Sequence, residues 1–242
     1  MKNIKKLVKT LAVSTLGLGI ATVSISEAQA ASLVPQTEGE IETTNLGCLD
    51  PNNCITSTEL GYTVTSFAFQ DFDASRLFSD NRATANSYGM GITFLSEDEG
   101  TNPEVGEFWL RPVAFKDGEV FEDGRLEAGL FEFDLGRTVS ELRLDFFDVE
   151  YDNSTAVVKI NGQDIQDLFV DAGEDGNTKT VVLNDLSKFT VQLGEAGGRF
   201  GTGDGVSLQV SVPESENLIG LSALAFAGVI TLKRRRRASQ KA

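Results

Sequence analysis

The chain contains no histidine among its 242 residues. This absence excludes Ser-His-Asp and Cys-His catalytic pairs, zinc sites built on histidine, and a histidine switch near neutral pH. Cysteine is scarce, with two residues, and tryptophan occurs once. Basic residues are also few, since 21 Lys and Arg stand against 36 Asp and Glu. The length suits one or two domains, and a hydrophobic content of 40% with 16 Phe indicates a packed core.

The first 30 residues have the pattern of a secretory signal peptide. Four lysines lie within the first nine residues, and an apolar run follows at 11–25. Ala28 and Ala30 occupy the small-residue positions of a cleavage site. The apolar run is short for a membrane-spanning helix and rich in Ser, Thr and Gly, so a retained anchor is the less favoured alternative. We expect a signal peptidase to cut after Ala30.

The C-terminal end carries a second targeting pattern. Pro213 and Glu214 precede an uncharged segment at 218–232, which would be about 22 Å long as a helix. Five basic residues follow this segment directly: Lys233, Arg234, Arg235, Arg236 and Arg237. Such a cluster stays on the cytoplasmic side of a membrane, which places the residues before Pro213 outside. A buried amphipathic helix is disfavoured, because the segment has only one Ser and one Thr and hence no polar stripe.

This order of parts resembles the PEP-CTERM sorting signal, in which a Pro-Glu-Pro tripeptide, a hydrophobic helix and an arginine cluster follow one another. Ser215 stands where that signal usually has its second proline. The resemblance implies recognition by an exosortase, a membrane-embedded cysteine transpeptidase-like enzyme. It also implies delivery to the cell envelope, the cell surface or the extracellular matrix. We therefore expect the C-terminal helix to cross the membrane transiently, before processing.

The part of the chain between the two targeting patterns is strongly acidic. Residues 31–213 contain 11 basic and 33 acidic residues, so their net charge is −22, compared with −15 for the whole chain. Because such a surface repels a phosphate backbone, nucleic acid is excluded as a partner. Calcium bound outside the cell would neutralise part of this charge.

Cys48 and Cys54 enclose a short sequence, Leu-Asp-Pro-Asn-Asn, that is rich in turn-forming residues. Outside the cytoplasm we expect a disulfide that closes this loop and stabilises the fold by about 2 kcal/mol. A metal site is the less favoured alternative, since two thiolates need further ligands and histidine is absent. The segment around the loop, 31–61, is expected to be a polar and loosely packed arm.

The chain from 62 to 212 predicts an all-β domain. Apolar and polar residues alternate in short segments separated by Gly, Asn and Asp. Strands are expected at 62–69, 88–95, 105–110, 126–135, 142–147, 155–160, 179–184, 189–193 and 206–212. Asn161-Gly162 predicts a tight turn, and a helical turn is expected near 74–78. The pattern favours an antiparallel two-sheet, jelly-roll-like β-sandwich.

A second resemblance lies inside this domain. Residues 125–134 read Arg-Leu-Glu-Ala-Gly-Leu-Phe-Glu-Phe-Asp, and together with 135–150 they resemble the LEVG family of PEP-CTERM proteins. Ala128 stands where the name-giving motif of that family has valine. The resemblance implies location and architecture and transfers no catalytic residue. The expected division is a signal peptide at 1–30, the arm at 31–61, the sandwich at 62–212, the sorting signal at 213–237 and a tail at 238–242.

Two acidic segments are candidate calcium sites. The first, 171–177, reads Asp-Ala-Gly-Glu-Asp-Gly-Asn and places oxygen ligands in a Gly-rich loop. The second comprises Asp145, Asp148, Glu150 and Asp152, of which the last three would share one face of a strand. A solvated turn and a polar outer face are the favoured interpretations, so no cofactor is assigned.

The sequence does not single out catalytic residues. Paired carboxylates about 5–10 Å apart can hydrolyse a glycoside, but no motif selects a pair among so many. Trp109 is expected in the core, although an exposed Trp109 would offer a platform for a sugar ring. We therefore expect a non-catalytic surface protein that is structural or binds extracellular polysaccharide. A secreted glycan-active hydrolase is the alternative.

Overall fold

The computed structural model describes residues 30–81, 83–95, 104, 106–121, 126–166, 168–195 and 205–211. This part of the chain is mostly β-structure, as the sequence predicts. Its helical elements are the 3₁₀ turn Pro51–Asn53 and α1 (Ser57–Leu60). Its strands are β1 (Ala30–Ser32), β2 (Gly39–Ile41), β3 (Cys54–Ile55), β4 (Thr63–Phe67), β5 (Arg76–Asn81), β6 (Asn86–Gly89), β7 (Ile92–Phe94), β8 (Phe108–Val113), β9 (Phe115–Lys116), β10 (Glu119–Val120), β11 (Gly129–Phe147), β12 (Ala156–Ile160), β13 (Gln163–Asp164), β14 (Thr178–Leu193) and β15 (Gly205–Ser211).

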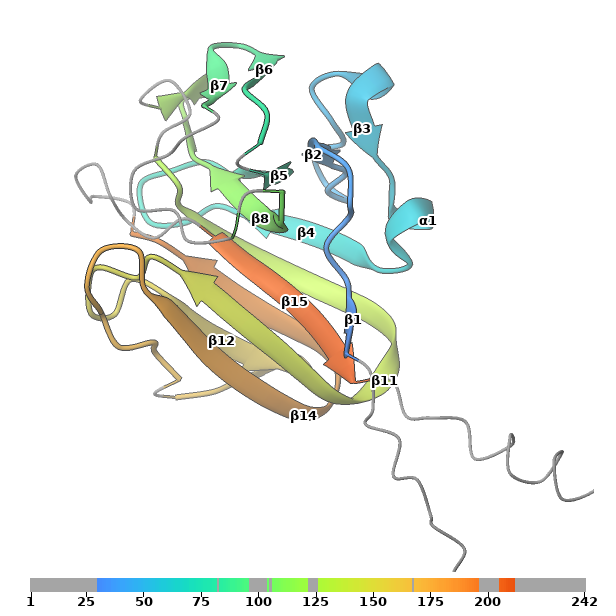
Figure 1. Ribbon diagram of the computed structural model, residues 1–242, viewed down its shortest axis with the longest axis vertical. Helices are drawn as coiled ribbons and strands as arrows, with labels where there is room; N and C mark the ends of the chain where they lie inside the picture. Colours follow the sequence, from blue (N-terminus) through green and yellow to red (C-terminus); the bar gives the residue numbers. More distant parts are fainter. Residues whose placement is uncertain are drawn as a thin grey trace, which may run out of the picture.

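One large mixed sheet organises the described chain. Its strand order is β13-β12-β14-β11-β15-β8-β5-β2-β3, with β1 added beside β15 and β4 beside β11. The long strands β11 and β14 pair from Gly129 opposite Leu193 to Phe147 opposite Thr178, and the register shifts once, between Asp134 and Val139. The first half of β11 also pairs with β4, and its second half with β15. Figure 1 shows these long strands running through the lower part of the molecule.

The pairing closes on itself around the main core. A parallel bridge joins Thr43, just after β2, to Val64 in β4, and the Thr44 N–H donates to the Val64 carbonyl at 2.8 Å. Since β4 pairs with β11, and β2 leads back to β11 through β5, β8 and β15, the backbone pairing forms a complete circuit. Fully buried side chains from several of these strands form the core, among them Ile41, Val64, Leu77, Leu110, Phe131, Leu144 and Val206.

Several predicted strands are confirmed. In β15 the side chains of Val206, Leu208 and Val210 are buried, while the residues between them are partly exposed. β4 shows the same alternation. The Asn161-Gly162 turn joins β12 to β13 with both residues at positive φ, 51° and 77°, which is the conformation that a two-residue hairpin turn requires.

Other local predictions are wrong. The helical turn expected near 74–78 is replaced by the start of β5, in which Leu77 and Phe78 are buried on opposite faces. Because both faces of β5 are covered, its apolar residues do not alternate with polar ones. The single strand expected at 88–95 is a hairpin of β6 and β7, which turns at Met90 with a φ of 50°. The strands expected at 126–135 and 142–147 are one strand, β11.

The loose packing expected for residues 31–61 is also wrong. This segment supplies β2 and β3, and Ile41 and Ile55 from these strands are buried in the main core. The two strands pair in parallel, Glu40 opposite Cys54 and Ile41 opposite Ile55, so the sheet is mixed and not purely antiparallel. The segment is polar in composition, and this composition did not indicate that a few of its apolar side chains are buried in the core.

Candidate functional site

The two ends of the described chain lie side by side. Ala30, after which cleavage is expected, pairs with Ser211 at the end of β15. β15 is held by β1, β11 and β8, and Figure 1 shows the end of β15 next to the start of β1. Among the described residues there is no helix long and apolar enough to cross a membrane. The other residues expected in processing and sorting lie outside the described chain: Ala28, Pro213, Glu214, Arg234, Arg235, Arg236 and Arg237.

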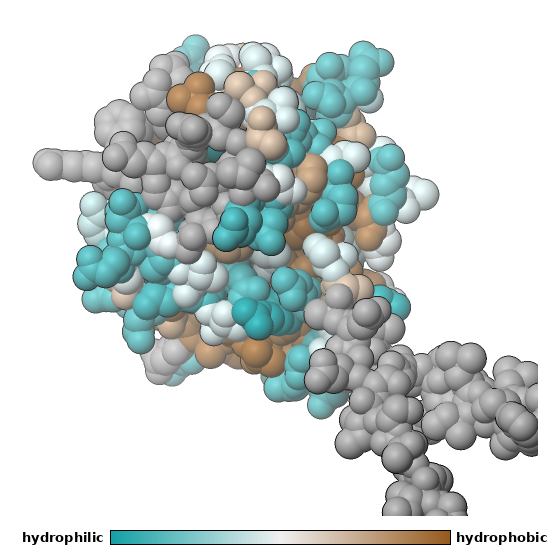
Figure 2. Space-filling model, viewed as in Figure 1, coloured by the Kyte–Doolittle hydropathy of each residue, from teal (hydrophilic) through white to brown (hydrophobic). Residues whose placement is uncertain are grey.

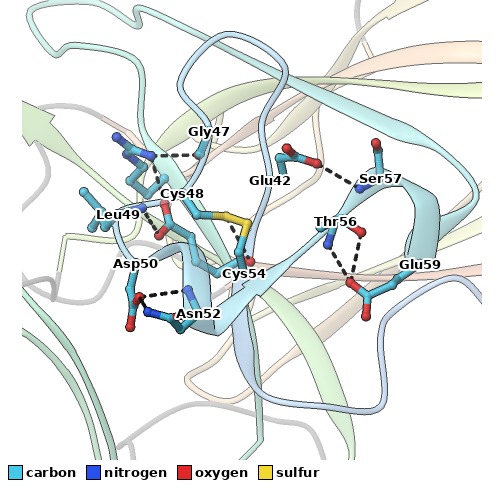
Figure 3. The surroundings of a disulfide bond; sticks show 12 residues. Glu42, Gly47, Cys48, Leu49, Asp50, Asn52, Cys54, Thr56, Ser57 and Glu59 are labelled. Carbon is cyan, nitrogen blue, oxygen red and sulfur yellow. Dashed lines mark hydrogen bonds and ion pairs between the residues drawn. A yellow bond between two sulfur atoms is a disulfide. The ribbon is translucent and has the colours of Figure 1, made fainter.

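Cys48 and Cys54 form the expected disulfide, which Figure 3 shows in its loop. The loop is also held by Glu40, a buried residue of β2 with 2% of its surface exposed. The Leu49 N–H donates to Glu40 at 2.6 Å, and Arg76 pairs with the other oxygen at 2.9 Å. Burial raises the pKa of Glu40, and these two partners oppose the shift. The loop is therefore fastened to β2 and β5 by polar contacts in addition to the disulfide.

The structure brings the two acidic segments together. Carboxylate oxygens of Asp148 and Glu150, from the second segment, lie within 4.8 Å of one another and of Asp175, from the first. Asp148 is buried, Glu150 is partly buried and Asp175 is exposed. Each segment looked like an ordinary polar turn in the sequence, and only the fold shows that they converge.

Backbone hydrogen bonds explain this convergence. β11 ends at Phe147, and Asp148 takes a positive φ of 50°, so residues 148–152 form a loop and do not share a strand face as expected. The Asp148 N–H donates to the Asn177 carbonyl at 2.7 Å, and the Gly176 N–H donates to the Asp148 carboxylate at 2.6 Å. The Gly173 N–H donates to the Val149 carbonyl at 2.8 Å. These hydrogen bonds join the two loops next to the carboxylates.

The remaining acidic residues have separate roles. Asp145 accepts hydrogen bonds from the Arg143 guanidinium at 2.9 Å and from Thr180. Asp152 accepts from the Ala172 N–H at 3.1 Å and so fastens one loop to the other. Asp171 is exposed. The cluster therefore offers three carboxylates, whereas calcium takes six to eight oxygen ligands, so that water would have to complete its coordination.

Trp109 is confirmed as a core residue, with 1% of its surface exposed, so it offers no platform for a sugar. The exposed aromatic residues are ones that the sequence did not single out. Tyr151 is 46% exposed, Phe169 is 45% exposed and Phe67 is 40% exposed. Tyr151 lies in the same loop as Glu150 and Asp152. Such side chains can stack on sugar rings, whereas buried ones cannot.

Three adjoining hollows of about 290, 340 and 410 Å³ lie around α1. Leu33 and Leu60 line both of the first two, and Tyr62 lines both of the last two. The carboxylates in them are Glu59 and Asp134, which lie in different hollows. Hydrogen bonds from Thr56 lower the pKa of Glu59, and a bond from the Gly136 N–H, with help from Lys188, lowers that of Asp134. A glycosidase acid needs the opposite shift.

Sequence reasoning also missed a buried ion-pair cluster. Arg111 in β8 pairs with Asp80 in β5 at 3.2 Å and with Glu127, which precedes β11. Its guanidinium lies 4.2 Å from the ring centre of Phe94 in β7. All three charged side chains are at least 94% buried. They are 16 to 47 residues apart in the chain, which left no local motif to find.

The comparisons with known proteins identify no relative. No protein-family model, no curated protein and no solved structure matches this chain.

Proposed function

We propose that the chain is an exported, exosortase-sorted surface or extracellular-matrix protein that is structural or binds glycan and does not catalyse a reaction. The pairing of Ala30 with Ser211 carries this proposal. The signal peptide would end at Ala30, and the sorting signal would begin two residues after Ser211. Both could be removed without taking away more than one strand residue. The two new ends would then lie at the same corner of the sheet.

The disulfide and the charge support an extracellular location. Disulfides persist outside the reducing cytoplasm, and the two cysteines of this chain are paired. Figure 2 shows hydrophilic residues over much of the coloured surface, with smaller apolar areas between them. An acidic surface of this kind favours solubility and attracts cations present in a matrix. Signal peptidase, exosortase and extracellular polysaccharide are the proposed partners.

The carboxylates that line the hollows around α1 do not have the raised pKa of a glycosidase acid. Glu59 and Asp134 both have lowered pKa values and lie in separate hollows. The exposed Tyr151 and Phe169 provide contact area for a glycan. We also propose that the sheet works as a two-layer sandwich. In this arrangement, β11 and β14 serve both layers, because β4 and β12 flank them at one end and β15 at the other.

Deletion of residues 218–237 tests the sorting proposal. The deleted protein should accumulate in soluble form in the periplasm or medium, whereas the intact protein should stay at the cell surface. Unchanged surface retention would refute sorting by this segment. A second variant, in which the four arginines at 234–237 are replaced by Gln, separates the effect of the charge cluster from that of the hydrophobic segment.

A glycan array tests the second part of the proposal. The exported protein, purified from the producing cells, should bind at least one polysaccharide, and Tyr151→Ala or Phe169→Ala should weaken that binding. A reducing-end assay on the bound polysaccharide should show no release of sugar. Release of reducing sugar in that assay would contradict the non-catalytic role and favour the hydrolase.

A further inference from the structure

A second face of the sheet carries charged residues under the β6–β7 hairpin. β2, β5 and β8 are neighbours, and alternate residues of β5 point to opposite faces. Leu77 packs into the main core, whereas Phe78 packs with Ile92 and Phe94 of the hairpin strand β7 in a separate cluster. Asp80 lies two residues beyond Phe78 and therefore shares its face. This face is enclosed between the sheet and the hairpin.

Acidic groups outnumber basic groups around this face. Arg76 pairs with Glu40 at 2.9 Å, and Arg111 pairs with Asp80 and with Glu127. Glu38 is a fourth carboxylate without an ion pair in the described chain. The charged groups described here are thus four carboxylates and two guanidinium groups. Buried charges of one sign are costly unless an opposite charge neutralises them.

Glu38, just before β2, is the neighbour of Asp80 in β5 on this face. β2 and β5 pair with Gly39 opposite Ser79 and Glu40 opposite Phe78. One step further in the same register places Glu38 opposite Asp80. Residues directly opposite on antiparallel strands have their Cβ atoms about 5 Å apart, and like charges in that position repel. A group that binds both carboxylates would remove this repulsion.

Three buried oxygens here have no hydrogen-bond partner. They are Asp80 Oδ1, Glu38 Oε1 and the Tyr88 hydroxyl. Asp80 is 1% exposed, and the ring of Tyr88 packs on Phe78 and Phe94 with centroid distances of 4.7 and 5.3 Å. Leaving such oxygens without a partner is costly, because they have been removed from water and gain no hydrogen bond in return. They are all oxygen ligands of the kind that a hard cation prefers.

The electrostatics agree with this arrangement. Burial, together with a smaller effect of the charge of Glu38, raises the pKa of Asp80 to about 6 against the opposing effect of Arg111. Burial also raises the pKa of Tyr88, and next in importance are the charges of Asp80 and Glu38. The negative charge of Glu38 therefore acts on both Asp80 and Tyr88, and that of Asp80 acts on Tyr88.

We propose that Glu38, Asp80 and Tyr88 form an internal site for a divalent, oxygen-preferring cation, with calcium as the expected occupant outside the cell. A charge of +2 would balance the two carboxylates that are in excess among the described charged groups. The three oxygens without partners would become its ligands, and water would complete its coordination. The bound ion would connect β2, β5 and β6, and so fasten the hairpin to the sheet. This site is separate from the surface cluster of Asp148, Glu150 and Asp175.

Calcium titration of the purified exported protein tests the site. Calorimetry with calcium chloride alone should detect binding, and the melting temperature should rise relative to protein in chelator. Glu38→Gln should weaken the affinity of this site by about tenfold or more, since it removes a charged ligand. This variant breaks no hydrogen bond or ion pair of the described chain, so its fold should be kept. Asp80→Asn should act in the same direction.

Asp175→Asn is the matched control, because it removes a carboxylate from the surface cluster only. It should leave the calcium affinity and the rise in melting temperature that depend on Glu38 unchanged. A wild-type protein that binds no calcium would overturn the proposal and leave a proton or a water molecule as the partner of these oxygens. Calcium binding that is lost in Asp175→Asn and kept in Glu38→Gln would also overturn it.

Discussion

Replacing both cysteines of the loop by serine should destabilise the protein by about 2 kcal/mol. The disulfide closes a loop of seven residues, because Cys48 and Cys54 are six positions apart. The chain-entropy relation for a loop of this length gives about 2 kcal/mol, which arises from the greater freedom of the unfolded chain. For a domain of this size, that loss lowers the melting temperature by about 4–8 °C.

The native loop should survive this change. Glu40 still accepts the Leu49 N–H, and Arg76 still reaches Glu40 and the Gly47 carbonyl at 2.9 Å. The serine variant should therefore keep its native spectrum while the unfolded chain expands. Urea denaturation, followed by the fluorescence of the buried Trp109, measures the midpoint of unfolding and the m-value. The midpoint should fall, and the m-value should rise slightly because the unfolded chain exposes more surface.

The wild-type protein treated with a reducing agent is the control and should match the double serine variant. Equal stability of the oxidised and reduced proteins would refute the reasoning, since the loop closure would then have no effect on the unfolded chain. A loss well above about 4 kcal/mol would refute it as well, because it would mean that the disulfide supports native packing.

Three further changes test the packing. Gly205→Ala should lower the free energy of unfolding in urea by about 3 kcal/mol or more, since the added Cβ would lie 2.1 Å from a backbone oxygen of β8. Gly136→Ala should lower it by only about 1–2 kcal/mol, the cost of its positive φ, because a Cβ added there meets no atom within 4 Å. Phe189→Ala should cost about 3–5 kcal/mol, because Phe189 is fully buried and stacks on Phe133 at 5.0 Å; a loss below about 1 kcal/mol would contradict the described core. Tyr62→Phe should cost about 1 kcal/mol at pH 7 by removing the partly buried hydrogen bond that the Tyr62 hydroxyl donates to the Leu33 carbonyl. Burial raises the pKa of Tyr62, so the unfolded chain ionises first, and wild-type stability should fall as pH rises through 10. The phenylalanine variant should show a smaller fall in an alkaline denaturation series, and an equal fall would refute this cause.

The strands that could be predicted from the sequence are those with one buried face and one more exposed face. β15 has one buried and one partly exposed face, so its alternation of Val and Leu with Ser and Gln was visible. β5 is covered on both faces, so its buried Leu77 and Phe78 follow one another without a polar residue between them, and no strand was predicted there. The parallel pairing of β2 with β3 joins two short strands that are separated by a loop, and no local pattern in the sequence indicates it.

Candidate sites were predictable only as separate pieces. Both acidic segments were visible in the sequence, but the meeting of Asp148 with Asp175 depends on a turn at positive φ and on hydrogen bonds between loops. The cluster around Arg111 was not visible, because an arginine in a strand looks solvent-exposed until the hairpin that covers it is known. Residues far apart in the chain meet there through the strand order of the sheet, which the alternation pattern does not specify.

We propose that this chain acts outside the cytoplasm, to which its two ends direct it. N-terminal sequencing and thiol labelling of the protein recovered from fractionated cells test this claim most directly. We predict that the mature protein begins at Ala31, lies in the envelope or medium, and has no thiol that reacts until it is reduced. A protein that begins at Met1, remains in the cytoplasm and labels at both Cys48 and Cys54 without reduction would contradict the account.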